Sequence, residues 1–355
     1  MKILIACDKF KGSLSAPDAC EAIAAGLPDH ECELCPIADG GEGFVEALLA
    51  ATSGKKIMAQ CRDAVGRDVA AEYALLDDGS AVIEMSAASG LWRIEAEEQD
   101  PRFANTYGTG QLMRHAIEES KATRLLIGIG GSATNDAGVG MAEALGAKFL
   151  EESGQPAMTI PEEFSKIASA DLSGIIDLPP ITVACDVSNP LLGPNGAAAI
   201  FGPQKGATSE TIPQLEAALE HIATLLKADH DFPGAGAAGG LGFGLKTFCN
   251  AELVSGFDLV AHALGLEEKI AAADVVITGE GSLDAQSLDG KGPIGLAKLA
   301  RAAGKKTIGI AGHVSEEAQS EFEATYALTD LDLPLETLMR EAKPLLEKLA
   351  QTIKL

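Results

Sequence analysis

Aromatic residues and positive charges are scarce in this chain. Phe, Trp and Tyr make up 4% of its 355 residues, so we do not expect a surface of stacked aromatic rings. The 52 acidic residues outnumber the 27 lysines and arginines, which gives a formal net charge of −25. Because a field of this sign repels phosphate backbones, the composition excludes nucleic-acid binding as the main role. A site for a small anion would need locally concentrated cations, backbone N–H groups or a metal ion.

Long apolar segments and a cysteine framework are also missing. The apolar run of residues 1–7 stops at Asp8 and is too short for a signal peptide or a membrane span. The seven cysteines are scattered, in a chain too large to need disulfides. Cys32 and Cys35 form a lone C-x-x-C, but residues three apart in a strand face opposite sides. We therefore expect a cytoplasmic protein without a membrane partner, and a homodimer stays open.

Alternating strand and helix signals occupy both ends of the chain. Apolar strands are expected at residues 2–7, 31–37, 274–278, 306–311 and 324–328. Helices are expected after the N-cap signal at Ser15 and at residues 44–51, 294–303 and 335–353. This βα alternation predicts an α/β fold in which both chain ends contribute to one parallel sheet.

The middle of the chain has a different character. Asp77-Asp78-Gly79 is a hairpin signal between two expected strands, 70–76 and 80–86. Further βα units follow, with expected strands at 124–129 and 181–185. We therefore expect two domains: a discontinuous one, 1–61 plus 269–355, and an inserted mixed α/β one, 62–268.

Five expected strands run into glycine-rich loops that carry charged or hydroxyl residues. These loops cover residues 8–13, 39–43, 130–136, 186–190 and 279–284. In open parallel sheets, ligands bind outside the carboxyl ends of the strands, so the five loops could meet around one ligand. The alternative is that each loop only turns the chain and caps the next helix.

The loop after strand 124–129 is the best candidate for binding phosphate. Its glycines let backbone N–H groups approach phosphate oxygens, and the next helix N-terminus adds partial positive charge. Asp136 could hold Mg²⁺ or cap that helix. No Walker A sequence and no protein-kinase motif occur in the chain. The nucleotide-binding candidates here are Gly130, Gly131, Ser132, Thr134 and Asn135.

Lysines and aspartates in the other loops suit phosphoryl transfer. Lys9 and Lys11 are compact cations that could neutralise a carboxylate or a phosphoryl group, although lysines also decorate ordinary surface loops. Asp39 and Asp186 could each act as general base or as Mg²⁺ ligand, and the sequence does not separate these roles. Ser13, Gly40 and Gly41 are candidates for substrate binding, and Glu280, Asp284 and Lys291 for nucleotide binding.

Two other functions fit parts of the sequence. Gly128-x-Gly130-x-x-Ala133 satisfies a loose dinucleotide fingerprint, which would make the chain an oxidoreductase of a small hydroxy acid with Glu151 or Glu152 on the ribose. A non-catalytic anion-binding protein would need the loops and lysines but no acids poised for proton transfer. The stretch from Gly234 to Gly244 fits either a flexible lid or a tight backbone crossing.

Several loops together resemble the bacterial glycerate kinase family. The matching segments are residues 8–13, 38–43, 128–138, 185–190, 202–207, 239–242 and 278–287. They occur in the family's order across nearly the whole chain. The resemblance implies ATP-dependent phosphorylation of D-glycerate with Mg²⁺, giving 2-phosphoglycerate. It also implies a flavodoxin-like domain made by both chain ends and an inserted domain of restriction-enzyme-like topology.

Overall fold

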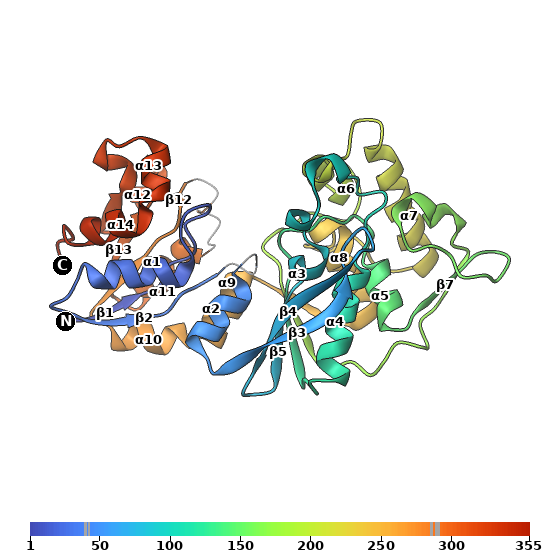
Figure 1. Cartoon of the computed structure of the whole chain (residues 1–355), viewed down its shortest axis with the longest axis horizontal. Coiled ribbons are helices and arrows are strands. Elements are labelled where there is room, and N and C mark those ends of the chain that lie inside the picture. Colours follow the sequence, from blue (N-terminus) through green and yellow to red (C-terminus); the bar gives the residue numbers. More distant parts are fainter. Residues whose placement is uncertain (39–40, 42, 285–286, 288–291) are drawn as a thin grey trace. The chain divides into compact units, whose positions relative to one another are not determined.

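The computed structural model describes residues 1–38, 41, 43–284, 287 and 292–355 (Figure 1). The chain divides into two compact units. Unit 1 comprises Met1–Asp39, Glu46–Ser53 and Gly256–Leu355, and unit 2 comprises Gly40–Val45 and Gly54–Ser255. The residues of helix α2 (Phe44–Ala51) are divided between the two units. No described helix is long and apolar enough to span a membrane.

Unit 1 is built from the two ends of the chain. Its strands are β1 (Lys2–Ile5), β2 (Glu31–Leu34), β11 (Val275–Thr278), β12 (Ser282–Leu283), β13 (Lys306–Ala311), β14 (His313–Val314) and β15 (Ala324–Ala327). Its helices are α1 (Ala16–Ala25), α9 (Gly256–Ala263), α10 (Leu266–Ala272), α11 (Gly292–Ala302), α12 (Glu316–Gln319), η6 (Leu328–Leu331), α13 (Leu335–Arg340) and α14 (Ala342–Ala350).

Five of these strands form one parallel sheet in the order β15-β13-β11-β1-β2. Counted within the unit, this is the flavodoxin-like order 2-1-3-4-5. Alternate residues of the strands, such as Ile3 and Ile5, pack on a core that includes α1 and α14, and Figure 1 shows α10 on the other side. The predicted α/β class, with a parallel sheet shared by both chain ends, is confirmed.

Local signals explain most element boundaries in unit 1. The Ser15 side chain caps α1 by accepting from the Asp18 backbone N–H at 3.2 Å, as the sequence predicts. Strand β2 lies at the edge of the sheet and is followed by Pro36, whose missing N–H is tolerated at an edge. One prediction is wrong: residues 335–353 form two helices, α13 and α14, because Pro344 cannot continue a helix through its preceding turn.

Unit 2 is built from the middle of the chain. Its strands are β3 (Gly54–Arg62), β4 (Asp68–Leu76), β5 (Ser80–Glu84), β6 (Arg124–Gly128), β7 (Lys148–Leu150), β8 (Ser169–Asp171), β9 (Ile181–Ala184) and β10 (Glu252–Val254). Its helices are α3 (Ser86–Ser89), η1 (Leu91–Arg93), η2 (Ala96–Glu98), α4 (Tyr107–Glu118), α5 (Val139–Leu145), η3 (Pro161–Lys166), α6 (Ala197–Phe201), η4 (Pro203–Lys205), α7 (Ile212–Leu226) and α8 (Ala237–Cys249).

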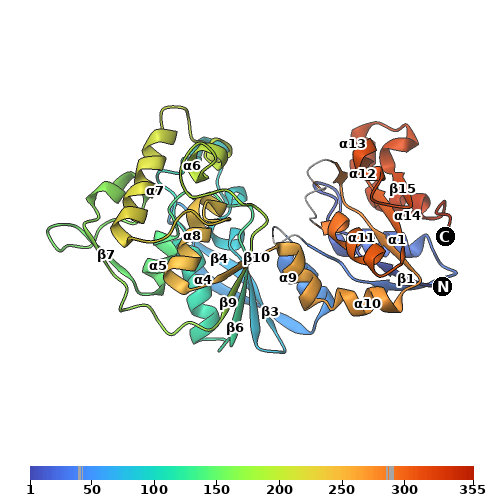
Figure 2. The same cartoon turned by 180° about the vertical axis from the view of Figure 1, so that it is seen from behind.

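The main sheet of unit 2 is mixed, with the order β10-β9-β6-β5-β4-β3. The strands from β10 to β5 are parallel, and Figure 2 shows β10, β9 and β6 at that edge. Strands β5, β4 and β3 are antiparallel. The predicted hairpin turn joins β4 to β5, with the Asp78 carboxylate accepting from the Ser80 backbone N–H at 2.8 Å. The mixed sheet begins at Gly54, within the range assigned to the first domain by sequence.

Candidate functional site

The loops of unit 1 meet where the strand order of its sheet reverses. Strands β1 and β11 are neighbours there, and ligands of open α/β sheets bind at such a switch point. The Asp8 backbone N–H donates to the Gly279 carbonyl at 2.9 Å. A Cβ built on Gly281 would lie 3.1 Å from the Lys11 backbone nitrogen. The loop 8–13 and the loop 279–284 are therefore in direct contact.

The side chains of the first loop differ in exposure. Asp8 is buried, with 6% of its surface exposed, and its Oδ1 accepts from the Lys9 backbone N–H at 2.6 Å. Asp8 was not predicted as a site residue, although its position directly after a buried strand could have indicated one. Lys9 is half-buried and Lys11 is exposed. The Ser13 hydroxyl donates to the Phe10 carbonyl at 3.0 Å and so helps to close the turn.

The second loop holds its two acidic candidates with its own hydroxyl groups. The Ser287 hydroxyl donates to Glu280 Oε1 at 2.7 Å. The Ser282 hydroxyl donates to Asp284 Oδ2 at 3.0 Å. Because carboxylates repel phosphates, Glu280 and Asp284 could serve a nucleotide only through ribose hydroxyls or a cation. Lys291, the predicted cation of this loop, lies outside the described residues.

The glycine-rich loop before α2 is described only in part. Asp39 and Gly40 lie outside the described residues, and Gly41 is half-buried. Glu84, which ends β5, accepts from the backbone N–H groups of Gly43 at 3.1 Å and Val45 at 2.9 Å. Glu84 is not among the site residues predicted from the sequence. It occupies the same strand-end position as the aspartates that were singled out.

Three parallel strands of unit 2 end in register. Glu84 pairs with Gly128, and Gly128 pairs with Ala184. Asp186 and Gly130 each follow two residues beyond this line, so the parallel ladder places them at the same edge of the sheet. Asp186 is half-buried. The structure thus brings the predicted phosphate loop and one predicted acid together within unit 2.

Most of the predicted phosphate loop is buried. Gly131 is exposed and Gly130 is half-buried, whereas the next polar side chains are enclosed. The Ser132 hydroxyl accepts from the Thr134 backbone N–H at 3.1 Å and lies 3.1 Å from the Thr134 hydroxyl. Both polar atoms of the Asn135 side chain are buried and have no hydrogen-bond partner among the described residues. The two glycines are therefore the accessible part of this loop.

Asp136 acts inside the protein as a cap. Its Oδ2 accepts from the backbone N–H of Thr106 at 2.8 Å, the Thr106 hydroxyl at 2.8 Å and the Gly140 N–H at 3.1 Å, and its Oδ1 from the Gly138 N–H at 3.3 Å. Burial raises the pKa of Asp136, and these donors offset part of the rise. Such contacts favour the capping role over the Mg²⁺ role. Because the N–H groups of Gly138 and Gly140 at the start of α5 already donate to Asp136, they are not available to a phosphate.

The stretch from Gly234 to Gly244 is a tight backbone crossing and not an exposed lid. Gly239 and Gly240 have φ values of +70° and +87° and are buried. A Cβ on Gly239 would lie 1.9 Å from the Thr134 carbonyl oxygen. The Ala137 backbone N–H donates to the Gly239 carbonyl at 3.1 Å. This crossing packs against the buried part of the phosphate loop, at Thr134 and Ala137.

Lys205 is the most unusual polar residue of unit 2. It is 1% exposed, and its Nζ donates to the Thr134 carbonyl at 2.6 Å and to the Ser132 hydroxyl at 3.5 Å. Burial lowers the pKa of Lys205 to about 7, and the charge of Asp136 opposes this shift. The sequence identified its segment only through the family resemblance, because an isolated lysine gives no sign that it is buried.

Known proteins match the chain over nearly its full length. The model of the glycerate kinase family matches residues 3–355. The chain belongs to the glycerate kinase family. A glycerate kinase from Bacillus subtilis is 42% identical, over 99% of this chain and 97% of its own length. A glycerate 2-kinase from Escherichia coli is 47% identical over 89% of this chain and 86% of its own length.

A solved structure also resembles this member of the glycerate kinase family. It is a crystal structure of a Salmonella typhimurium LT2 protein assigned as glycerate kinase 2, with a TM-score of 0.87 and 42% identity. It covers 99% of this chain and 96% of its own chain. The present chain is thus a kinase, as the sequence predicts. A kinase requires a phosphate donor, and for this family that donor is a nucleotide.

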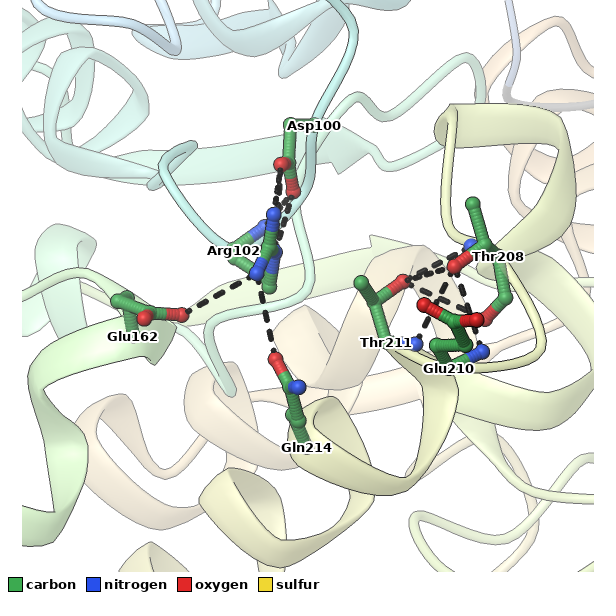
Figure 3. A network of polar contacts seen from close by, with 7 residues as sticks. All are labelled: Asp100, Arg102, Glu162, Thr208, Glu210, Thr211 and Gln214. Atoms are coloured by element: carbon green, nitrogen blue, oxygen red, sulfur yellow. Dashed lines mark hydrogen bonds and ion pairs between the residues drawn. The ribbon is translucent and has the colours of Figure 1, made fainter.

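A pocket on the side of unit 2 lies outside these loops. Arg102, Gln214 and His221 are among the residues that line its volume of about 230 Å³. Figure 3 shows Arg102 between Asp100, Glu162 and Gln214. Arg102 donates to both Asp100 oxygens, to Oδ1 at 3.1 Å and to Oδ2 at 2.6 Å. Because its charge is already neutralised, this pocket gives a glycerate kinase no cation for its anionic ligands.

The dinucleotide fingerprint does not have its required surroundings. In that motif an acidic residue ends the second strand of a parallel βαβ unit. Here Glu151 and Glu152 begin a turn, closed by a hydrogen bond of 2.9 Å from the Glu151 N–H to the Gln155 carbonyl. Strand β7, which precedes them, pairs antiparallel with β8 in a separate sheet. The kinase family and this local structure both weigh against the oxidoreductase hypothesis.

Proposed function

We propose that this enzyme transfers the γ-phosphoryl group of ATP to D-glycerate with the aid of Mg²⁺, giving 2-phosphoglycerate. The observation that supports this most directly is the family match over residues 3–355. The relative from Escherichia coli, 47% identical, is named a glycerate 2-kinase. Its name supports the hydroxyl group at position 2 as the acceptor.

Unit 1 supplies the positive charge that the reaction needs. Glycerate and ATP are anions, and the chain as a whole carries a formal net charge of −25. Lys9 and Lys11 lie at the switch point of the parallel sheet, where they can neutralise the carboxylate of glycerate and the transferring phosphoryl group. Ser13 of the same loop is proposed to bind the substrate, as are Gly40 and Gly41, which belong to unit 2.

Unit 2 supplies backbone N–H groups and the carboxylate of Asp186. The exposed Gly131 and the half-buried Gly130 can approach phosphate oxygens without steric hindrance from a side chain. Ser132, Thr134 and Asn135 support these glycines from inside the unit. Glu280, Asp284 and Lys291 are also proposed as nucleotide-binding residues.

The residues present fit a Mg²⁺ ion that arrives with the nucleotide. No cluster of three or more His, Cys, Asp or Glu side chains suited to a metal occurs among the described residues. Mg²⁺ is commonly held by one or two carboxylates together with substrate phosphates and water. Asp186 is the described carboxylate best placed for this, and the ion would neutralise charge on the phosphates. Of Asp39 and Asp186, the one that does not hold the ion is proposed as the base that accepts the proton of the glycerate hydroxyl.

Product analysis tests this function. Purified enzyme with ATP, Mg²⁺ and D-glycerate should release ADP, and phosphorus NMR should show one phosphorylated product whose shift matches 2-phosphoglycerate. A 3-phosphoglycerate signal would overturn the position of transfer while keeping the kinase. Reduction of NAD in place of ADP release would favour the oxidoreductase. ATP binding without ADP release would favour a binding protein.

A further inference from the structure

Several energetically unfavourable features gather within a few residues of the phosphate loop. Ala137 and Ala238 both adopt positive φ values, 53° and 52°, which L-residues rarely adopt. The buried side-chain atoms of Asn135 have no partner among the described residues. Lys205 is buried although lysine is normally exposed. Costs of this kind persist only where the surrounding structure enforces them, and they concentrate at functional sites.

Lys205 holds the loop through its backbone. Its Nζ donates to the Thr134 carbonyl at 2.6 Å and to the Ser132 hydroxyl at 3.5 Å. Ser132 in turn accepts from the Thr134 backbone N–H at 3.1 Å and donates to the Ala238 carbonyl at 3.3 Å. One ammonium group therefore connects η4, the loop 132–134 and the start of α8. All three segments lie in unit 2.

The charge of Lys205 also acts on the accessible glycines. In a buried environment of low dielectric constant, a charge is felt over longer distances than at a surface. Gly131 precedes Ser132 directly and is exposed. An ammonium group beneath this loop counteracts the negative field of the chain where a phosphate would approach. Asp136, which carries four hydrogen bonds of its own, is the acidic group whose charge acts on Lys205.

We propose that Lys205 is a positioning residue for the phosphate donor: from inside unit 2 it fixes the Ser132–Thr134 segment and gives the loop its positive potential. This inference rests on the proposed function, because it assigns the loop 130–134 to the nucleotide. Lys205 touches the loop and not the reacting atoms. Loss of Lys205 should therefore weaken nucleotide binding and leave glycerate binding unchanged.

The test compares Lys205→Met with Lys148→Met, which removes an exposed lysine from β7 in the same unit. Calorimetry with a non-hydrolysable ATP analogue and Mg²⁺ gives the nucleotide affinity without turnover. We expect Lys205→Met to weaken it about 100-fold, since small misplacements of a binding loop have effects of this order. The KM for glycerate should change less than threefold. Lys148→Met should match the wild type in both.

The pH profile separates positioning by charge from a merely structural role. Wild-type kcat/KM for ATP should fall as the pH rises through about 7, where Lys205 loses its proton. This limb should be absent from Lys205→Met and present in Lys148→Met. Normal analogue binding by folded Lys205→Met would overturn the proposal. So would equal losses toward ATP and glycerate that accompany a lower melting temperature.

A second variant keeps the test valid if Lys205→Met does not unfold cooperatively. Lys205→Gln keeps an N–H donor for the Thr134 carbonyl but carries no charge, and the same criteria apply to it. The proposed function can fail independently: if the wild type does not phosphorylate glycerate, the function is wrong. Analogue binding still decides the role of Lys205 in that case.

Discussion

The loop 8–13 of unit 1 and the loop 130–136 of unit 2 each follow a buried parallel strand, but they expose different groups. In unit 1 two of the accessible positions carry lysine side chains, the exposed Lys11 and the half-buried Lys9. In unit 2 the surface positions are Gly131 and Gly130, and the polar side chains lie inside. Unit 1 thus offers charged side chains, and unit 2 offers backbone N–H groups. The predictions below test this contrast.

The two aspartates of unit 2 should differ most. Asp186→Asn should lower kcat about 10²–10⁴-fold, the range expected when a proton-accepting or metal-binding carboxylate is lost, while the melting temperature stays near that of the wild type. Asp136→Asn should instead destabilise the protein by about 3 kcal/mol, because both carboxylate oxygens accept hydrogen bonds and the NH2 group of asparagine cannot accept at one of these positions. An ADP-release assay and thermal melts measure the two effects.

The exposed Asp177 provides the control, since Asp177→Asn should change neither property. The contrast fails if Asp186→Asn keeps activity within threefold of the wild type. It also fails if Asp136→Asn melts normally but loses Mg²⁺-dependent turnover, because that result would return Asp136 to the metal site.

Glycines of unit 2 should respond to substitution according to their packing. Gly239→Ala places a Cβ 1.9 Å from the Thr134 carbonyl oxygen, and we expect a loss of about 3 kcal/mol in the free energy of unfolding. Gly154 has a similar φ, +78°, but a Cβ on it would have no atom within 4 Å. Gly154→Ala should therefore cost only the conformational penalty, about 1 kcal/mol. Urea titrations measure both values, and equal losses would contradict the tight crossing.

The lysines of unit 1 should affect substrate binding and leave stability unchanged. Lys9→Met should lower kcat/KM for glycerate about 30-fold, as expected for losing a charge-assisted hydrogen bond of about 2 kcal/mol. Lys11→Gln should raise the KM about fivefold, and less in 0.5 M salt, where exposed charges are screened. Lys55→Gln, an exposed change in β3, is the control. A destabilised but active Lys9→Met would show that this lysine is structural.

The same contrast explains what the sequence could and could not predict. Hydrophobic alternation and the Ser15 cap were sufficient to predict the parallel sheet and its helices, because these signals act over a few residues. Because Lys9, Lys11 and Asp186 follow expected strands, the sequence also predicted that they lie at the carboxyl edges of the sheets. The burial of Asn135 and Asp136 depends on Gly239, about 100 residues away in the chain, and no local signal announces such a contact.

Lys205 shows the same limit for a charged residue. Sequence reasoning assumes that lysines are exposed, and only the fold places this one against the Thr134 carbonyl. Pro344 shows the opposite case, in which a local rule was overlooked: a proline three residues into a helix predicts that the preceding segment ends, as α13 does at Arg340. A careful use of proline would have predicted two helices.

The smallest expected effect concerns the exposed charges of unit 1 away from its loops. Lys343 on α14 donates to Asp18 on α1 at 2.7 Å, and this contact, with that of Ser15, lowers the pKa of Asp18. A lowered carboxylate pKa stabilises the folded protein above the unfolded pKa, near 4, and this contribution is lost as the pH falls through the lower pKa of the folded state. Because both side chains are 46% exposed, Lys343→Met should lower the free energy of unfolding only slightly at pH 7, and by less at pH 3. Urea titrations of this variant at both pH values measure the difference. A loss of several kcal/mol would mean that surface charge stabilises unit 1 as strongly as buried hydrogen bonds stabilise unit 2, and the contrast between the units would no longer hold.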